Sequence, residues 1–198
     1  FLSANQCRVV ADQFETPLYI YSEEKIRQAC SETLAFPNAF GLTVRYALKA
    51  NPLSAFLKIA DQQGVHFDAS SEFELARCLE LGISPEKIQL TAQQFPKTYL
   101  NLFEDERLRF NACSLRQLNS FGLAYPNREI SVRINPGLGS GSNRKTNVGG
   151  PASSFGIWFE QMDEIRSIAA NHGLKITRLH THIGSGTDPE VWKKVARM

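Results

Sequence analysis

A lysine stands where a strand of a parallel sheet is expected to end. The apolar residues Val44, Tyr46 and Leu48 alternate with their neighbours, which predicts a strand with one apolar face. Pro52 stops this strand, and Lys49 lies at its end on the opposite face. A lysine amine held there can form a Schiff base with a carbonyl compound, if its surroundings lower its pKa from about 10.4. A lone lysine at a strand end is usually a surface charge, so the assignment depends on its neighbours.

Later strands bring further polar side chains to the same face as the lysine. Their apolar residues alternate with polar ones, so the two sets lie on opposite faces. The predicted cluster is Lys49, Asp68, Asn111, Arg133 and His182, with Ser185 in the loop beyond. Charges buried together are stable only when they pair with one another or with a ligand. Asp68 can offset one of the two cations, and the remaining positive charge predicts an anionic ligand.

Two histidines, His180 and His182, share one face of the last predicted strand. A zinc site needs at least three protein ligands, and His66 is a candidate third without a matching cysteine or glutamate. We therefore expect no metal. His182 stacked on a flat cofactor ring is the preferred interpretation, and His180 is alternatively a core histidine bonded to the backbone.

Two glycine-rich segments could contact a ligand. Gly184-Ser185-Gly186 precedes a predicted helix and could hold a phosphate through backbone N–H groups and the serine hydroxyl, although such a turn alone is weak evidence. Residues 137–151 form a long polar loop that contains Arg144 and Lys145. These two cations either attract substrate carboxylates or are simply solvated.

Strands and helices alternate along the chain, which implies a parallel sheet with right-handed crossovers. Strands are expected at 44–49, 65–69, 87–91, 108–113, 129–134 and 175–183, and helices at 23–34, 54–63, 72–81, 97–103, 115–121, 161–171 and 189–198. A doubly wound sheet and a barrel both fit this order. The two-faced strands favour the barrel, because strands of a sheet covered by helices on both faces are almost continuously apolar.

The expected fold is therefore α/β, an incomplete (β/α)8 TIM-type barrel. Six β/α units are expected, and such barrels typically need about 250 residues, whereas this chain has 198. Residues 1–36 are expected to form an N-terminal strand (Thr16–Ser22) and a helix leading into the barrel, and residues 37–198 the partial barrel. We expect the chain to be a fragment of a longer protein.

Composition excludes several classes of protein. The chain is 42% hydrophobic and 21% charged, as globular proteins are, and its net charge of +2 argues against a nucleic-acid partner. It has no apolar run long enough for a membrane span and no signal-peptide pattern at its start. Four widely spaced cysteines, Cys7, Cys30, Cys78 and Cys113, indicate reduced thiols in a cytoplasmic protein.

Four motifs together resemble the barrel-type, alanine-racemase-like pyridoxal-phosphate decarboxylases, and among them the diaminopimelate decarboxylases. They are YALKANP at 46–52, RINPG at 133–137, SFGI at 154–157 and HTHIGSG at 180–186. The segment 145–158 looks like one bacterial branch of that enzyme. The likeness covers nearly the whole chain and keeps the motifs in order.

The resemblance implies pyridoxal 5'-phosphate as cofactor, carried by Lys49. His182 would stack on the pyridine ring, Ser185 with Gly184 would bind the phosphate, and Asp68 and Arg133 would shape the pocket. It also implies a second, β-rich domain that is missing here, and a homodimer with its sites at the subunit interface. The strand expected at 16–22 would then pack with the β-rich domain.

The implied activity is decarboxylation of a small amino acid, meso-diaminopimelate to L-lysine and CO2. The alternatives are a polyamine-type decarboxylase acting on ornithine, lysine or carboxynorspermidine, and a non-catalytic cofactor-binding relative. The family's triple glycine for phosphate and its Glu-Pro-Gly-Arg would lie beyond Met198, so the chain alone is expected to be inactive. Gly149-Gly150 is not that phosphate loop, and Ser154 stands where relatives carry a lysine in the same loop.

Overall fold

A single parallel sheet organises the chain. The computed structural model describes residues 1–141, 149–150, 153–186 and 188–198. Within them the strands follow the order β1-β2-β3-β4-β5-β6, and β7 also pairs with β5. All pairings are parallel. The strands are β1 (Arg45–Ala47), β2 (His66–Ala69), β3 (Ile88–Leu90), β4 (Arg109–Ala112), β5 (Glu129–Asn135), β6 (Ile157–Trp158) and β7 (Lys175–His180).

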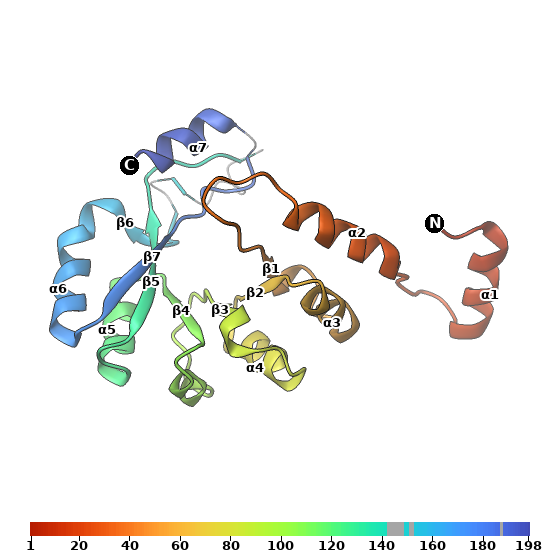
Figure 1. The fold of residues 1–198 in the computed structure, drawn as a ribbon, viewed down its shortest axis with the longest axis horizontal. Coiled ribbons are helices and arrows are strands. Elements are labelled where there is room, and N and C mark those ends of the chain that lie inside the picture. The colour runs from red at the N-terminus through yellow and green to blue at the C-terminus, as the bar shows by residue number, and fades with distance from the viewer. Residues whose placement is uncertain (142–148, 151–152, 187) are drawn as a thin grey trace.

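Helices lie around the outer side of an arc of strands (Figure 1). They are α3 (Ser54–Gln62), α4 (Glu72–Glu80), α5 (Leu115–Ala124) and α6 (Met162–His172), with α7 (Pro189–Ala196) after β7. Short 3-10 turns complete the connections: η1 (Leu48–Ala50), η2 (Pro85–Lys87), η3 (Leu100–Glu104) and η5 (Phe159–Gln161). The α/β alternation predicted from the sequence is thus confirmed, and the sheet is an open arc rather than a closed barrel.

Serine hydroxyls start two of the outer helices directly after a strand. The Ser71 hydroxyl accepts a hydrogen bond from Glu74 N at the start of α4, and Ser114 does the same for Gln117 N at the start of α5. Each cap satisfies a backbone donor that the first helical turn leaves free. The caps therefore turn the chain outward at the C-terminal end of β2 and of β4.

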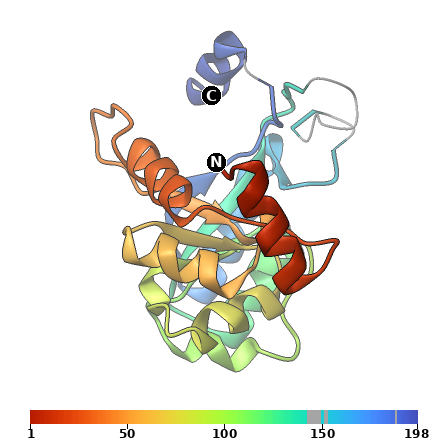
Figure 2. The same cartoon turned by 90° about the vertical axis from the view of Figure 1, so that its right-hand side faces the viewer.

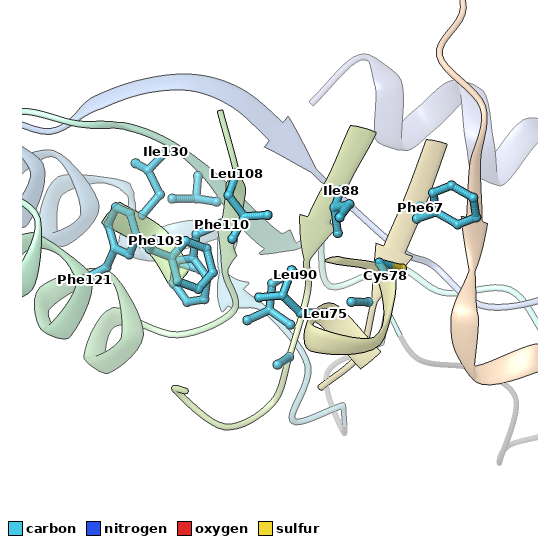
Figure 3. Close-up of a cluster of buried hydrophobic side chains, with 14 of the residues drawn as sticks. Phe67, Leu75, Cys78, Ile88, Leu90, Phe103, Leu108, Phe110, Phe121 and Ile130 are labelled. Atoms are coloured by element: carbon cyan, nitrogen blue, oxygen red, sulfur yellow. The ribbon is translucent and has the colours of Figure 1, made fainter. Parts of the chain in front are cut away.

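The core between the sheet and its outer helices is largely aromatic around β4 (Figure 3). The rings of Phe110 and Phe121 are stacked, with centroids 5.0 Å apart and planes at 12°. Phe103 meets both rings edge to face, and all three side chains are almost fully buried. Burial of such rings stabilises by roughly 3 kcal/mol each, which fixes β4 against α5.

The N-terminal segment differs from the prediction. Residues 16–22 form no strand, because no other strand of the described chain lies alongside them, and Tyr19 is 90% exposed. Instead α1 (Ala4–Phe14) precedes α2 (Glu23–Leu34), which was predicted. A capping box between Ser3 and Gln6 starts α1, and none of its residues is buried. Figure 2 shows α1 from the side. The division at residue 36 stays a prediction.

Two further predictions need correction, and one strand was not predicted. Lys49 does not end a strand, because β1 pairs with β2 only as far as Ala47 and the chain then turns into η1. The helix expected at 97–103 is the 3-10 turn η3. Finally, β6 escaped prediction because it has only two residues, too few for an alternation pattern.

Candidate cofactor-binding site

Lys49 lies in η1, at the C-terminal end of β1, and is exposed. The preceding Leu48 is completely buried, so burial changes from one residue to the next in this turn. The charge of Lys49 acts on two other predicted site residues: it opposes the burial that raises the pKa of Asp68, and it adds to the burial and the Arg133 charge that lower the pKa of His182. The structure therefore brings the lysine, the acid and the histidine together.

Asp68 is the acceptor of a polar network across three strands. The Thr91 hydroxyl donates to Asp68 Oδ1 at 2.6 Å, and Gln89 Nε2 donates to the same oxygen at 3.4 Å. Asn111 Nδ2 in turn donates to Thr91 Oγ1 at 3.3 Å. Burial raises the pKa of Asp68, although these hydrogen bonds and the nearby cations Arg45 and Lys49 oppose the shift. The carboxylate is thus oriented before any ligand binds.

Arg133 is a buried cation in β5, with only 7% of its surface exposed. Burial lowers its pKa, and the neighbouring Cys113 and Asp68 oppose that shift. Its guanidinium lies 5.1 Å from the centre of the Phe155 ring, a cation–π distance. It makes no ion pair closer than 4 Å within the described part of the chain. A buried guanidinium of this kind is free to pair with an anionic group.

The two histidines have different surroundings. His180 pairs with Arg133 across β7 and β5, and burial together with Arg133 and His182 lowers its pKa to about 4. His182 is exposed just beyond β7, and its pKa is also lowered, by partial burial and then by Arg133 and Lys49. Both rings are therefore neutral near pH 7. The buried Nδ1 of His180 has no hydrogen-bond partner in the described structure.

The loop after β7 is held by the loop after β5. Ser140 N donates to Ile183 O at 2.8 Å, and Gly186 N donates to Ser140 O at 2.9 Å. A Cβ at Gly186 would overlap the Ser140 side chain, so a larger residue would push the two loops apart. Gly184 is buried at φ +116°, and Ser185 is exposed. This close approach fixes the turn that contains Gly184 and Ser185, the residues predicted to bind a phosphate.

A buried asparagine organises the end of β5. Asn135 Nδ2 donates to the carbonyl oxygens of Gly150 and Ser153, both at 3.3 Å, while Asn135 Oδ1 accepts from Gly137 N at 3.0 Å. One amide thereby ties the start and the end of the glycine-rich loop to the sheet. Arg144 and Lys145, proposed as substrate contacts, lie outside the described residues.

The sequence analysis missed several members of this site. Gln89 of β3 and Thr91 just after it both hydrogen-bond to Asp68 of the neighbouring β2. The two-residue alternation against Ile88 and Leu90 could have placed them on the face of Asp68. Buried Gln117 links Cys113 N with the carbonyl oxygens of the loop after β3, at 2.7 to 2.9 Å. No local pattern signals that link, because it joins separate β/α units.

The donor set fits one cofactor class. An amine suits an aldehyde, a neutral imidazole suits a flat ring, and a hydroxyl on a tight turn suits a phosphate. The buried guanidinium adds the positive charge that an anionic ligand requires. By contrast, no group of three or more His, Cys, Asp or Glu able to hold a metal ion occurs within the ranges that the structure describes.

Comparison with known proteins agrees with this donor set. The family described as "Pyridoxal-dependent decarboxylase, pyridoxal binding domain" matches residues 24–197. The chain belongs to this family of pyridoxal-dependent decarboxylases. Pyridoxal phosphate is therefore its cofactor, and the open arc of strands is part of the TIM-like barrel of such enzymes.

Several relatives share one name. The diaminopimelate decarboxylases of Streptomyces coelicolor and Escherichia coli are 36% and 30% identical to this chain, each over 94% of it, and it covers 42% and 44% of their lengths. A crystal structure of diaminopimelate decarboxylase superposes with a TM-score of 0.85 at 28% identity, covering 97% of this chain and 45% of that one. The Helicobacter pylori enzyme complexed with L-lysine superposes at 0.77 and 26% identity, covering 96% and 51%. This pyridoxal-dependent decarboxylase chain thus spans about half the length of its relatives.

Proposed function

We propose that the whole protein decarboxylates meso-diaminopimelate to L-lysine and CO2. The observation that carries the proposal is the convergence of Lys49, Asp68 and His182 at one end of the sheet, where the charge of the lysine acts on both partners. The identities of 30 to 36% to diaminopimelate decarboxylases support this substrate over other amino acids.

Each residue has a distinct part in the proposal. Lys49 carries the cofactor on its amine, and Asp68, oriented by Thr91, keeps a negative charge beside it. His182 backs the flat ring, and because its pKa is lowered it does so as a neutral imidazole. The Ser185 hydroxyl and the backbone at Gly184 hold the phosphate. Bound pyridoxal phosphate supplies an electron sink for the pair left when the carboxyl group departs as CO2.

Arg133 supplies the positive charge that an amino-acid substrate or the phosphate requires. It is buried and lies on an aromatic ring, so its position is fixed before a ligand arrives. A guanidinium prepared in this way binds an oxyanion without the entropic cost of ordering a long side chain.

Two properties of the whole protein complete the proposal. It is a homodimer, whose second subunit contributes to the site, and it acts in the cytoplasm. No helix among the described residues is both long and apolar enough to cross a membrane. The implied second domain and the homodimer are tested together by the mass of the full-length protein in solution.

The activity is tested with the full-length gene product and added pyridoxal phosphate. CO2 release is measured from meso-diaminopimelate, ornithine, lysine and carboxynorspermidine, and only the first is expected to support rapid turnover. Preference for one of the other three would instead identify the polyamine-type decarboxylase.

Two lysine variants provide the matched control. Lys49→Ala is expected to abolish CO2 release and the visible absorption of the lysine-bound cofactor. Lys58→Ala removes an exposed lysine of α3 and should change neither. Absence of turnover in the parent, with the visible band present and lost only in Lys49→Ala, would support a non-catalytic cofactor-binding relative.

A further inference from the structure

The turn that carries Lys49 leads into a helix without a polar cap. Leu53 stands at the N-cap of α3, directly after this turn, and its apolar side chain offers no acceptor to the first helical turn. The helices after β2 and β4 begin instead with the capping hydroxyls of Ser71 and Ser114. The chain after β1 therefore needs other contacts to fix its position.

Local hydrogen bonds shape the turn itself. The Tyr46 hydroxyl donates to Asn51 O at 3.3 Å, and Asn51 Oδ1 accepts from Leu53 N at 3.1 Å. The second bond closes an Asx turn just before α3. Both bonds join residues at most five positions apart, so they give the turn its form but do not tie it to a neighbouring β/α unit.

Arg77 of α4 supplies the link to the neighbouring unit. Its Nε donates to Pro52 O at 2.9 Å, and its Nη2 donates to Ser54 Oγ at 2.7 Å. These acceptors flank Leu53, and they precede the arginine by 25 and 23 positions. A planar guanidinium holds two acceptors in one relative position, because its donors point in fixed directions. Arg77 therefore fastens the end of the Lys49 turn and the first residue of α3 to α4.

The same helix also holds the strand that carries Asp68. Glu74 Oε2 accepts from Ser70 N at 2.6 Å, which bonds the chain directly after β2 to the first turns of α4. Glu74 and Arg77 are three positions apart, so they lie on one side of the helix. The helix thus holds the backbone two residues after Asp68 and three residues after Lys49.

We propose that Arg77 is a positioning residue, which sets where the Lys49 amine stands relative to Asp68 and to bound pyridoxal phosphate. This role rests on the proposed function, in which Lys49 carries the cofactor. Arg77 acts through the backbone of the turn, and its hydrogen bonds are made before any ligand arrives. If the turn shifts, the amine meets the aldehyde of the cofactor in the bonding geometry less often. Cofactor attachment and turnover then fall together.

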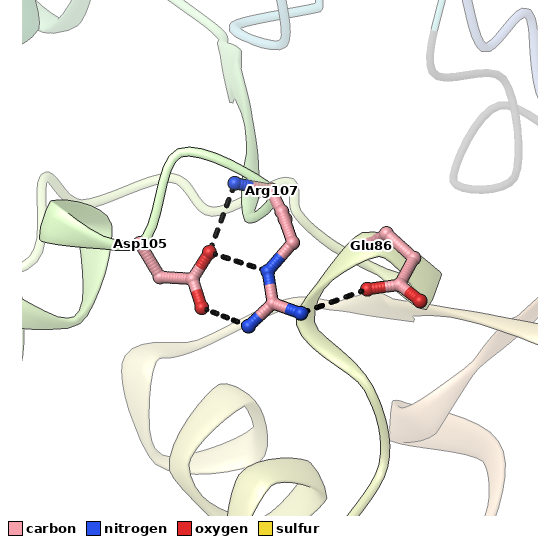
Figure 4. A network of polar contacts seen from close by, with 3 residues as sticks. All are labelled: Glu86, Asp105 and Arg107. Carbon is pink, nitrogen blue, oxygen red and sulfur yellow. Dashed lines mark hydrogen bonds and ion pairs between the residues drawn. The ribbon is translucent and has the colours of Figure 1, made fainter.

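Arg107 provides a matched control at the other end of the sheet. It precedes β4, and its guanidinium donates to Asp105 at 3.0 and 2.7 Å, with Glu86 3.6 Å away (Figure 4). Its side chain is 61% exposed, and its partners are carboxylates rather than the backbone of the Lys49 turn. Arg107→Gln and Arg77→Gln therefore remove the same charge and a similar pair of hydrogen bonds.

Titration with pyridoxal phosphate tests the role of Arg77. The cofactor is added to the cofactor-free, full-length protein, and the visible absorption of the lysine-bound form gives the dissociation constant. Arg77→Gln should raise this constant about tenfold, the effect of losing one charge-assisted hydrogen bond. It should lower kcat for CO2 release by a similar factor and leave KM nearly unchanged, because the substrate's own contacts remain. Arg107→Gln should match the parent in all three quantities.

A double-mutant cycle separates positioning from a general structural effect. Ser54→Ala removes one of the two acceptors and should raise the dissociation constant of the cofactor about threefold. Combined with Arg77→Gln it should add nothing further, because the contact between the two residues is already lost. Urea unfolding of each cofactor-free variant establishes that it is folded.

The proposed role is overturned if Arg77→Gln binds the cofactor as tightly as the parent, if Arg107→Gln weakens binding equally, or if the effects of Arg77→Gln and Ser54→Ala add. The visible band of Lys49→Ala distinguishes this failure from failure of the proposed function. If the band is lost in Lys49→Ala while Arg77→Gln binds normally, the role of Arg77 alone is refuted. A band that persists in Lys49→Ala would refute both.

Discussion

The two ends of the parallel sheet handle charge in different ways. At the C-terminal end Asp68, Thr91 and Asn111 form a connected network, and Arg133 rests on Phe155. At the N-terminal end Arg109 and Arg178 repel Arg45, and Arg45 Nε and His66 Nδ1 have no hydrogen-bond partner among the residues that the structure describes. Both sets of residues lie on the same strands and the same face, separated by only two to four positions.

This contrast indicates which properties come from the fold and which from individual residues. The alternation of a strand places a side chain inside the arc at either end equally well. A fixed side-chain geometry requires in addition that neighbouring strands supply hydrogen-bond partners. Thr91, at the end of β3, is such a partner for Asp68 of β2. The C-terminal end is therefore prepared for its ligand, whereas the N-terminal end has only the exposed Glu129 paired with Arg178 in the described chain.

Among the changes that compare the two ends, the largest expected effect follows from removing the acid at the C-terminal end. Asp68→Asn keeps an acceptor for Thr91 but loses the charge beside Lys49, and should lower the activity of the full-length protein about 100-fold, the cost of one strong charged interaction. Because burial raises the pKa of Asp68, the ionised form opposes folding at pH 7. The variant should therefore unfold at a higher urea concentration than the parent. Lower stability together with normal turnover would contradict this account.

A second expectation concerns pH and His180. The folded protein keeps this ring neutral down to about pH 4, whereas the unfolded chain protonates it near 6.5, so between these values the unfolded state binds the extra proton. The stability due to neutral His180 is complete above pH 6.5 and is lost as the pH falls towards 4. Urea unfolding should show about 2 kcal/mol less stability at pH 5 than at pH 7 from this group. His180→Leu should remove that part of the pH dependence, and an unchanged dependence would refute the assignment.

A smaller effect is expected from the hydroxyl that orients Asp68. Thr91→Val conserves the shape of the side chain but removes its hydrogen bond to Oδ1, which should weaken pyridoxal phosphate binding about tenfold. Thr91→Ser keeps the hydroxyl and should restore binding. Equal cofactor affinity in Thr91→Val, Thr91→Ser and the parent would show that Asp68 needs no positioning.

The smallest effect is expected at the N-terminal end. Glu129 is exposed and its contact with Arg178 is 3.4 Å long, so Glu129→Gln should change the free energy of unfolding by less than about 1 kcal/mol. If Glu129→Gln instead lowered the free energy of unfolding by several kcal/mol, the ion pair at the N-terminal end would be as firmly held as the hydrogen-bond network at the C-terminal end.

Much of the fold was predictable because its strands have two distinct faces. Six of the seven strands were predicted, all but β6, and alternation assigned Asp68, Asn111 and Arg133 to one face. Motif resemblance then gave the cofactor and the family. The strand expected at 16–22 was wrong because β propensity alone cannot supply a neighbouring strand with which to pair.

The parts of the site that escaped prediction depend on contacts between separate units. The bond from Thr91 to Asp68 joins residues 23 positions apart, and the support of Gly186 by Ser140 joins two loops. Lys49 was predicted at the end of a strand, but it lies in a 3-10 turn, which reflects where pairing between β1 and β2 stops. Such features follow from register, which the periodicity of a single strand does not determine.

The central claim, that Lys49 carries the cofactor, is tested most directly by chemical trapping. The full-length protein is loaded with pyridoxal phosphate, reduced with sodium borohydride, digested with trypsin and analysed by mass spectrometry. The account predicts a stable phosphopyridoxyl adduct on the peptide that contains Lys49. An adduct confined to another lysine, such as Lys58 or Lys145, or no adduct on any peptide, would contradict it.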